Sequence, residues 1–158
     1  MKLTFIIPPI LILFSSCYSY KINPKELRNY TYSGKKQKVY VLNPELKKEY
    51  KILEDSTIFE ITSDSADKTM LNIKLHPFKK RLACGQLIMG SLITLGQVPV
   101  LLPDRYEYFF DEINNNITTT RTIEMQIAQR CWFWDMFVFN KKFNQKAGQV
   151  LSAKYNPL

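Results

Sequence analysis

Apolar and polar positions alternate most clearly in the second half of the chain. Residues 106–113 and 117–130 flank three consecutive asparagines, and in the second stretch Ile123, Met125 and Ile127 alternate with more polar side chains. A period of two is typical of a strand that buries one face, and Asn tolerates the left-handed conformations of tight loops. The pattern predicts a long β-hairpin with its turn at Asn114, Asn115 and Asn116.

Three shorter stretches in the first half have the composition of strands. Residues 37–42 (QKVYVL) and 57–62 (TIFEIT) are rich in β-branched and aromatic residues. Residues 70–76 alternate between apolar and polar side chains, with His76 on the polar face. The polar segment 63–67 favours a turn, so we expect the second and third strands to form an antiparallel hairpin.

A helical spacing of apolar residues follows Asn43. Asn43, Pro44 and Glu45 would supply a cap, a proline at the first helical position and an acid near the positive end of the helix dipole. We expect this helix to end near residue 55. The residues of its apolar face are Leu46, Tyr50 and Leu53.

The last part of the chain, residues 132–155, is expected to contain an aromatic stretch followed by a second helix. Gly148 falls within this helix and weakens its intrinsic propensity. The apolar stripe of the helix consists of Met136, Phe139, Phe143, Ala147 and Val150.

These elements predict an α+β fold, in which one face of an antiparallel sheet of about five strands packs against two helices. The chain has 158 residues, which allows one compact domain, and we place that domain at residues 37–158. Residues 17–36 contain Pro24, Gly34 and scattered charged side chains. We expect this range to be a tether that holds the domain off a bilayer, and a frayed terminus is the alternative.

The N-terminus has the features of a secretion signal. Lys2 is followed by twelve uncharged, mostly apolar residues, and then by Ser15 and Ser16. The apolar run is too short to cross a bilayer, which needs about 20 residues, and Pro8 and Pro9 would break a spanning helix. Residues 1–16 are therefore expected to be a signal peptide.

The segment Phe14-Ser15-Ser16-Cys17 resembles the lipobox of bacterial lipoproteins. The resemblance implies cleavage before Cys17, a diacylglycerol thioether on its sulfur and usually an N-terminal acyl chain such as palmitate. Most lipoboxes have Leu where this chain has Phe14, and looser versions with Phe resemble those of spirochaetes. Tyr18 replaces the Asp that favours inner-membrane retention in some bacteria, which favours the outer membrane. A secreted protein with a free Cys17 and an uncleaved anchor are the alternatives.

The remainder resembles small uncharacterised envelope lipoproteins, in which an apolar T-L-G-x-x-P stretch leads into an aromatic strand. Residues 94–99 match that stretch, and Tyr106 and Tyr108 begin the strand. The resemblance implies no particular activity.

Residues 82–103 contain no charged side chain. The segment is expected to be buried core, divided by its glycines and Pro99; a membrane-dipping or partner-binding loop and a membrane span are the alternatives. Residues 132–139 contain five aromatic side chains, which are expected to pack in the core. A membrane-facing patch is the alternative for them, because Trp favours bilayer interfaces.

Charge limits the partners of the protein. Lys and Arg number 22 against 14 Asp and Glu, which gives a net charge of +8 in short basic groups along the chain. We expect most of these groups to be solvated, with anionic lipid headgroups or acidic glycans as the alternative partners. Nucleic acid is not expected as a partner of an exported protein.

The sequence predicts no catalytic residues, no metal site and no cofactor. His76 is the one histidine, and no second histidine or ligand spacing accompanies it. Ser91 does not lie in the G-x-S-x-G nucleophile motif. Asp111 and Glu112 are adjacent, so they point to opposite faces of a strand and do not form a carboxylate pair. We therefore do not expect an enzyme.

Cys84 and Cys131 are candidates for a disulfide. Once Cys17 is lipidated, two thiols remain, and they allow one intramolecular pairing. Envelope compartments can be oxidising. Two separate buried thiols are the alternative.

The sequence as a whole predicts a lipid-anchored cell-envelope lipoprotein with a non-enzymatic binding or structural role. Its expected partners are the membrane, through the lipid, and an envelope protein or an anionic lipid or glycan. A surface-exposed host-interaction protein and a hydrolase of unrecognised type are the alternatives.

Overall fold

The computed structural model describes residues 18–23, 25–63, 70–81, 99–114, 117–132 and 142–155. These residues form an α+β fold with a six-stranded mixed sheet, two α-helices and one short 3-10 helix. The elements are β1 (Tyr18–Ile22), η1 (Lys25–Asn29), β2 (Gln37–Val41), α2 (Lys47–Glu54), β3 (Phe59–Ile61), β4 (Leu71–Arg81), β5 (Val100–Asn114), β6 (Ile117–Cys131) and α4 (Phe143–Lys154).

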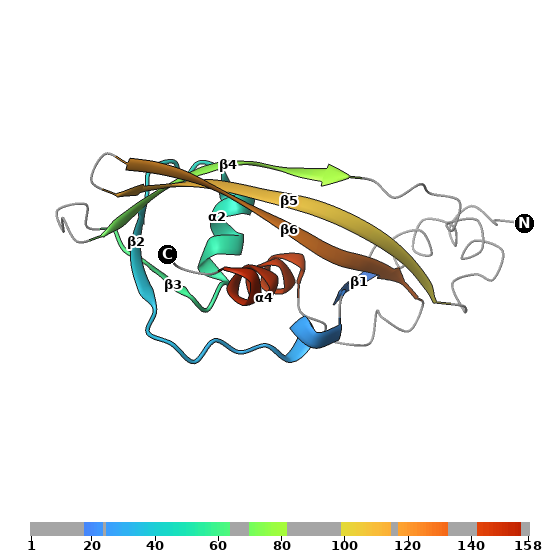
Figure 1. Cartoon of the computed structure of the whole chain (residues 1–158). Coiled ribbons are helices and arrows are strands. Elements are labelled where there is room, and N and C mark those ends of the chain that lie inside the picture. The colour runs from blue at the N-terminus through green and yellow to red at the C-terminus, as the bar shows by residue number, and fades with distance from the viewer. Residues whose placement is uncertain are drawn as a thin grey trace, which may run out of the picture.

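The sheet has the strand order β1-β6-β5-β4-β2-β3 and curls over both helices, which lie on its concave side (Figure 1). Its centre is the antiparallel hairpin of β5 and β6, paired from Asn114 and Ile117 at the turn to Val100 and Cys131 at the far end. This hairpin confirms the strongest prediction from the sequence. We call the side of the sheet that faces the helices the inner face and the opposite side the outer face.

The expected hairpin between the second and third strands is wrong. β2 lies between β3 and β4 and is parallel to both of them. The cause is α2, which connects β2 to β3 and, as crossover helices do, places the next strand parallel to the first. The sheet is therefore mixed and has six strands instead of about five antiparallel ones.

The sixth strand, β1, falls in the range 17–36 that was expected to be a tether. It pairs antiparallel with β6 from Tyr18 opposite Cys131 to Ile22 opposite Ile127. The Arg28 side chain of η1 donates a hydrogen bond to the Ile22 carbonyl (2.8 Å) and holds the following turn. At least residues 18–22 thus belong to the sheet.

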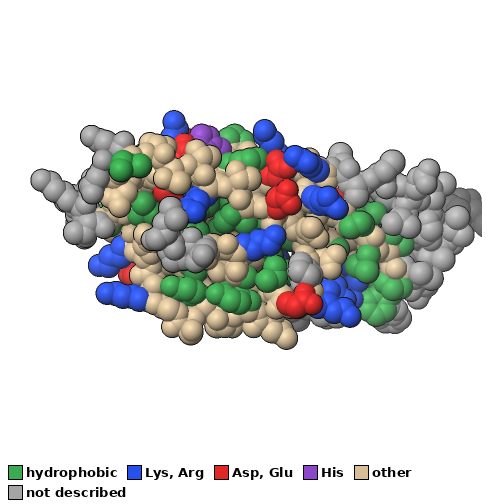
Figure 2. Space-filling view, in the orientation of Figure 1, with side chains coloured by type: hydrophobic (Ala, Val, Ile, Leu, Met, Phe, Trp, Pro, Cys, Tyr) green, Lys and Arg blue, Asp and Glu red, His purple; other side chains and the backbone are tan. Residues whose placement is uncertain are grey.

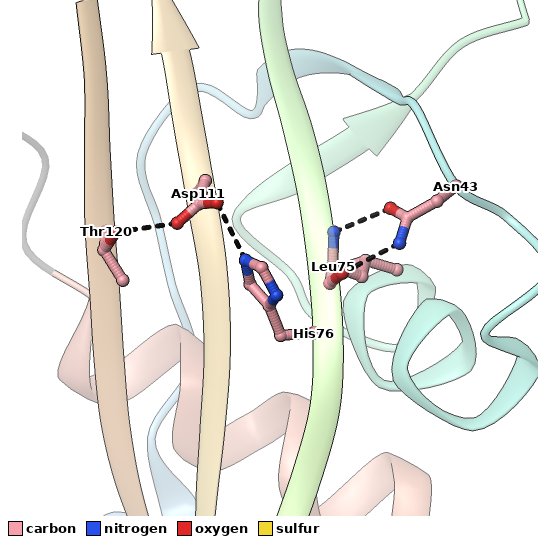
Figure 3. Close-up of polar contacts among 5 residues, drawn as sticks. All are labelled: Asn43, Leu75, His76, Asp111 and Thr120. Atoms are coloured by element: carbon pink, nitrogen blue, oxygen red, sulfur yellow. Dashed lines mark hydrogen bonds and ion pairs between the residues drawn. The ribbon is translucent and has the colours of Figure 1, made fainter.

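Helix α2 begins four residues after the predicted cap. Asn43 does not cap it; its side-chain amide instead accepts a hydrogen bond from the Leu75 N–H (2.7 Å) and donates one to the Leu75 carbonyl (2.8 Å) (Figure 3). Leu46 occupies the cap position without a side-chain hydrogen bond. The amide thus fastens the start of the α2 segment to β4.

The core lies between the inner face and the helices. Tyr108 and Phe110 of β5 are 1% and 0% exposed, and Leu53 of α2 and Leu151 of α4 are fully buried beside them. Gly148 lets α4 approach the loop after α2 closely, since a Cβ here would lie 2.7 Å from the Asp55 carbonyl carbon. Gly148 lowers the intrinsic helix propensity of this segment, but the close packing of α4 against the loop requires a residue without a Cβ.

A break in β4 is stabilised by a buried carboxylate. The register of β4 and β5 shifts between His76 and Lys79, around Pro77, which cannot donate a backbone hydrogen bond. Glu49 of α2, 7% exposed, accepts a hydrogen bond from the Phe78 N–H (3.0 Å). The helix thus satisfies a backbone group that the irregular strand leaves unpaired.

Candidate functional site

Two regions of the described structure bring polar side chains together: the outer face of β4, β5 and β6, and a cleft beside η1. The outer face is not covered by any described helix (Figure 1). The one histidine lies at the upper edge in Figure 2, next to Lys or Arg and Asp or Glu side chains.

His76, Asp111 and Thr120 form a hydrogen-bonded chain across three strands (Figure 3). The Nε2 atom of His76 lies 2.8 Å from Oδ2 of Asp111, and the Thr120 hydroxyl donates to Oδ1 of Asp111 over 2.7 Å. The hydrogen bond from His76, and next that from Thr120, lower the pKa of Asp111. The carboxylate is in the middle of this chain, whereas a nucleophile triad needs the imidazole in the middle. The arrangement therefore joins β4, β5 and β6 and does not activate a hydroxyl.

Asp111 and Glu112 point to opposite faces, as the sequence predicted. Glu112 is 8% exposed on the inner face and accepts a hydrogen bond from Nε of Arg121 on β6 (3.1 Å). The guanidinium of Arg121 in turn lies 5.9 Å from the centre of the Tyr155 ring. Burial, and next the Glu112 carboxylate, raise the pKa of Tyr155. This tyrosine therefore stays neutral and packs.

A second buried carboxylate lies at the other end of β5. Asp104 is 5% exposed, accepts a hydrogen bond from the Tyr106 hydroxyl (3.0 Å) and lies 2.8 Å from Nζ of Lys80. Burial, and next the Asp104 charge, raise the pKa of Tyr106 above the ordinary range. Glu112 and Asp104 thus each have a cationic partner, which is how a fold usually compensates the loss of water around a buried charge.

An open cleft of about 550 Å³ lies where the chain after η1 meets the end of α2 and the side of α4. Its lining includes Arg28, Tyr30, Asp55, Thr57 and Gln149. The Gln149 amide donates to the Arg28 and Tyr30 carbonyls, and its Oε1 has no hydrogen-bond partner among the described residues. The cleft offers amides, hydroxyls and one charge of each sign, which suits a small polar ligand.

The predicted site residues lie mostly outside the described ranges. This is true of Cys17 and of Cys84. The backbone of Cys131 ends β6, opposite Tyr18 on one side and Val100 on the other. The Cys84–Cys131 disulfide thus stays a prediction.

Only the end of the uncharged segment 82–103 is described, and residues 100–103 of it open β5. Residues 82–98 lie outside the described ranges, as do residues 133–141, which hold most of the aromatic cluster. In the part of the chain that is described, no helix has the length and apolar character needed to cross a bilayer. The same part contains no group of three or more His, Cys, Asp or Glu side chains able to hold a metal ion.

No protein-family model matches the chain, and no curated protein matches it either.

The sequence did not reveal the cleft, because its lining residues come from three separate segments and share no motif. It also did not reveal which basic residues lie together on the outer face. The alternation in β5 and β6 indicates which of their side chains share a face, but the sequence analysis did not recognise β1 as the strand next to β6.

Proposed function

We propose that this protein is a lipid-anchored cell-envelope protein with a binding or structural role and no catalytic one. The acyl chains would be attached to Cys17 after removal of residues 1–16, and the outer membrane would be its location. Its partners would be the membrane and an envelope component.

The observation that carries the proposal is the position of Cys17 between two segments. An apolar signal and two serines precede it, and β1 begins with the next residue, Tyr18. A lipid on Cys17 would thus be attached directly to a strand of the sheet, and the domain would be held against the bilayer. Two or three acyl chains give a durable anchor, whereas one gives only marginal binding.

A non-catalytic role is supported by the outer-face hydrogen bonds. His76 is the one histidine, and it is committed to Asp111 in an order that does not fit nucleophilic catalysis. Asp104 and Glu112 are buried with cationic partners instead of converging on an open pocket.

The test is metabolic labelling of producing bacteria with a clickable fatty acid, comparing the wild type with Cys17→Ser. We expect label on the wild type only, with the wild type in the membrane fraction and the variant released from it. Cys131→Ser is the matched control, because it removes a thiol without touching the lipobox. Equal labelling of the wild type and Cys17→Ser would contradict the proposal.

A further inference from the structure

Three neighbouring strands of the sheet meet at the end next to Cys17. β1 begins there at Tyr18, β6 ends there at Cys131 and β5 begins there at Val100, and these three residues are register partners. We call the residues of the outer face within about 17 Å of this end, five residues along a strand, the proximal surface. A lipid on Cys17 would place this surface at the bilayer. Its side chains would then determine whether the protein contacts the lipid headgroups.

Four basic side chains lie on the proximal surface. Arg130 is opposite Leu101, and Lys21 is opposite Ala128, next to Pro103. Arg105 is opposite Arg81 on β4. Lys21, Arg81 and Arg105 are exposed.

The register pairing of Arg81 with Arg105 is unfavourable for the sheet by itself, because like charges directly opposite each other repel. The nearest carboxylates among the described residues of this face are Glu107, which forms an ion pair with Arg81, and its exposed register partner Glu124 on β6. The four basic side chains outnumber these two carboxylates, so the described residues of this surface carry a net positive charge. An anion outside the protein would relieve the remaining repulsion.

Apolar side chains lie among these charges. Leu101 is 45% exposed, and Pro103 is exposed two residues further along β5. The Arg130 guanidinium lies 5.1 Å from the Trp132 ring centre and donates a hydrogen bond to the Ser19 hydroxyl. Basic groups together with Trp and Leu are the combination that binds the headgroup region of a bilayer.

The other end of the outer face has a different composition. Lys74 on β4 is the register partner of Asp111 on β5, so a positive and a negative charge lie side by side. The neighbouring outer-face residues of β6 are uncharged: Thr118, Thr120 and Thr122. The positive charge is thus concentrated at one end of the surface, the end that continues into Cys17.

We propose that the proximal surface binds anionic lipid headgroups and thereby lays the sheet against the membrane. The proposal rests on the lipid anchor described above, which fixes which end faces the bilayer. Lys21, Arg81, Arg105 and Arg130 contact headgroup phosphates, and Leu101 and Trp132 reach the boundary of the acyl chains. The cleft beside η1 then stays accessible from the side.

The test measures headgroup binding without the acyl chains. Every described element lies within residues 18–155, so a chain that starts at residue 17 and carries Cys17→Ser retains all of them. This chain is floated with vesicles of phosphatidylcholine alone or of phosphatidylcholine with phosphatidylglycerol. We expect binding only to the second, and loss of that binding at 1 M salt, where charges are screened within about 3 Å.

Two double variants locate the surface. Lys21→Gln with Arg105→Gln should weaken binding roughly 25-fold, since each basic residue near an anionic membrane contributes about fivefold. Lys48→Gln with Lys74→Gln removes the same charge from α2 and the far end of the outer face, and should leave binding within about twofold of the parent chain. Circular dichroism confirms that both variants are folded.

Three results would overturn the inference: no flotation of the parent chain with anionic vesicles, equal flotation with both vesicle types, or equal loss in the two double variants. The first of these would show that the surface does not bind anionic headgroups. Fatty-acid labelling of Cys17 is a separate experiment. A wrong proposal about the lipid anchor can therefore be distinguished from a wrong proposal about headgroup binding by the proximal surface.

Discussion

Neighbouring side chains on β5 belong to two different surfaces. Tyr106, Tyr108 and Phe110 face the helices and are 5%, 1% and 0% exposed. Arg105 and Phe109 alternate with them and face away. The inner face holds the fold together by excluding water, while the outer face is not covered by any described helix.

Because the two faces have different neighbours, stability and surface binding should respond to different substitutions in this protein. Substitutions on the inner face should change the free energy of unfolding, and substitutions on the outer face should change binding and titration. Four predictions test this separation, from the largest expected effect to the smallest.

Phe110→Ala should lower the free energy of unfolding by about 3–5 kcal/mol, because it removes a fully buried ring and leaves a cavity. Phe109→Ala is the matched control on the adjacent residue, which is half-buried on the outer face next to Lys79. It should cost less than half as much. Urea denaturation measures both, and similar losses for the two variants would show that the faces do not differ as described.

Gly148→Ala should destabilise the domain by about 3 kcal/mol, since the added Cβ meets the backbone of Asp55 and Ser56 at 2.7–2.9 Å. Backbone atoms cannot turn away as a side chain can. Gly34→Ala is the control: its Cβ meets the Tyr32 side chain instead, which can rotate. Thermal unfolding should therefore shift clearly for the first variant only, and a stable Gly148→Ala protein would refute the close approach of α4.

Asn43→Ala should cost about 2 kcal/mol, because it leaves both the N–H and the carbonyl of Leu75 without their side-chain partners. Asn29→Ala, an exposed residue at the end of η1, is the comparison and should be almost neutral. Hydrogen exchange of the Leu75 amide gives a local readout. An unchanged exchange rate in Asn43→Ala would contradict the role of this side chain.

The smallest effect concerns acid titration on the outer face. The hydrogen bond from His76 lowers the pKa of Asp111 below its ordinary value of 3.8. The carboxylate therefore contributes stability at pH values above 3.8, and the contribution is lost as the pH falls through the lowered pKa. In His76→Ala the pKa should rise toward 3.8, as followed by NMR of the Asp111 carboxyl carbon.

Lys74→Ala is the control for this titration, since Lys74 also lowers the pKa of Asp111 but contributes least. Its effect should be smaller than that of His76→Ala. The reverse order would mean that general charge, and not the hydrogen bond, determines the titration.

The sequence predicted those features of the fold that depend on local pattern. The alternation around Ile123 and Met125 identified the β5–β6 hairpin, and the apolar stripe at Phe143 and Ala147 identified α4. The order of the strands was not predictable in this way. Whether β3 pairs with β2 or with β4 is determined by how α2 packs, and no property of TIFEIT reports it.

The missed strand and the displaced helix start have physical explanations. Tyr18, Tyr20 and Ile22 alternate with polar residues, but five residues next to a predicted lipid site resemble a tether as much as an edge strand. Asn43 has the chemistry of a cap, and the same amide can bond both backbone groups of a neighbouring strand. In both cases contacts with distant parts of the chain determine the structure: β1 pairs with β6, and the Asn43 amide bonds to β4.

The pairing of β1 with β6 has a consequence for the order of folding. Tyr18 and Cys131 are register partners, yet they are translated at opposite ends of the domain. The residues of β1 must therefore stay unpaired until β6 has been synthesised, and such distant pairings form slowly. During that interval the edge of β6 that β1 will occupy presents unpaired backbone groups, which is the kind of edge that pairs with other chains.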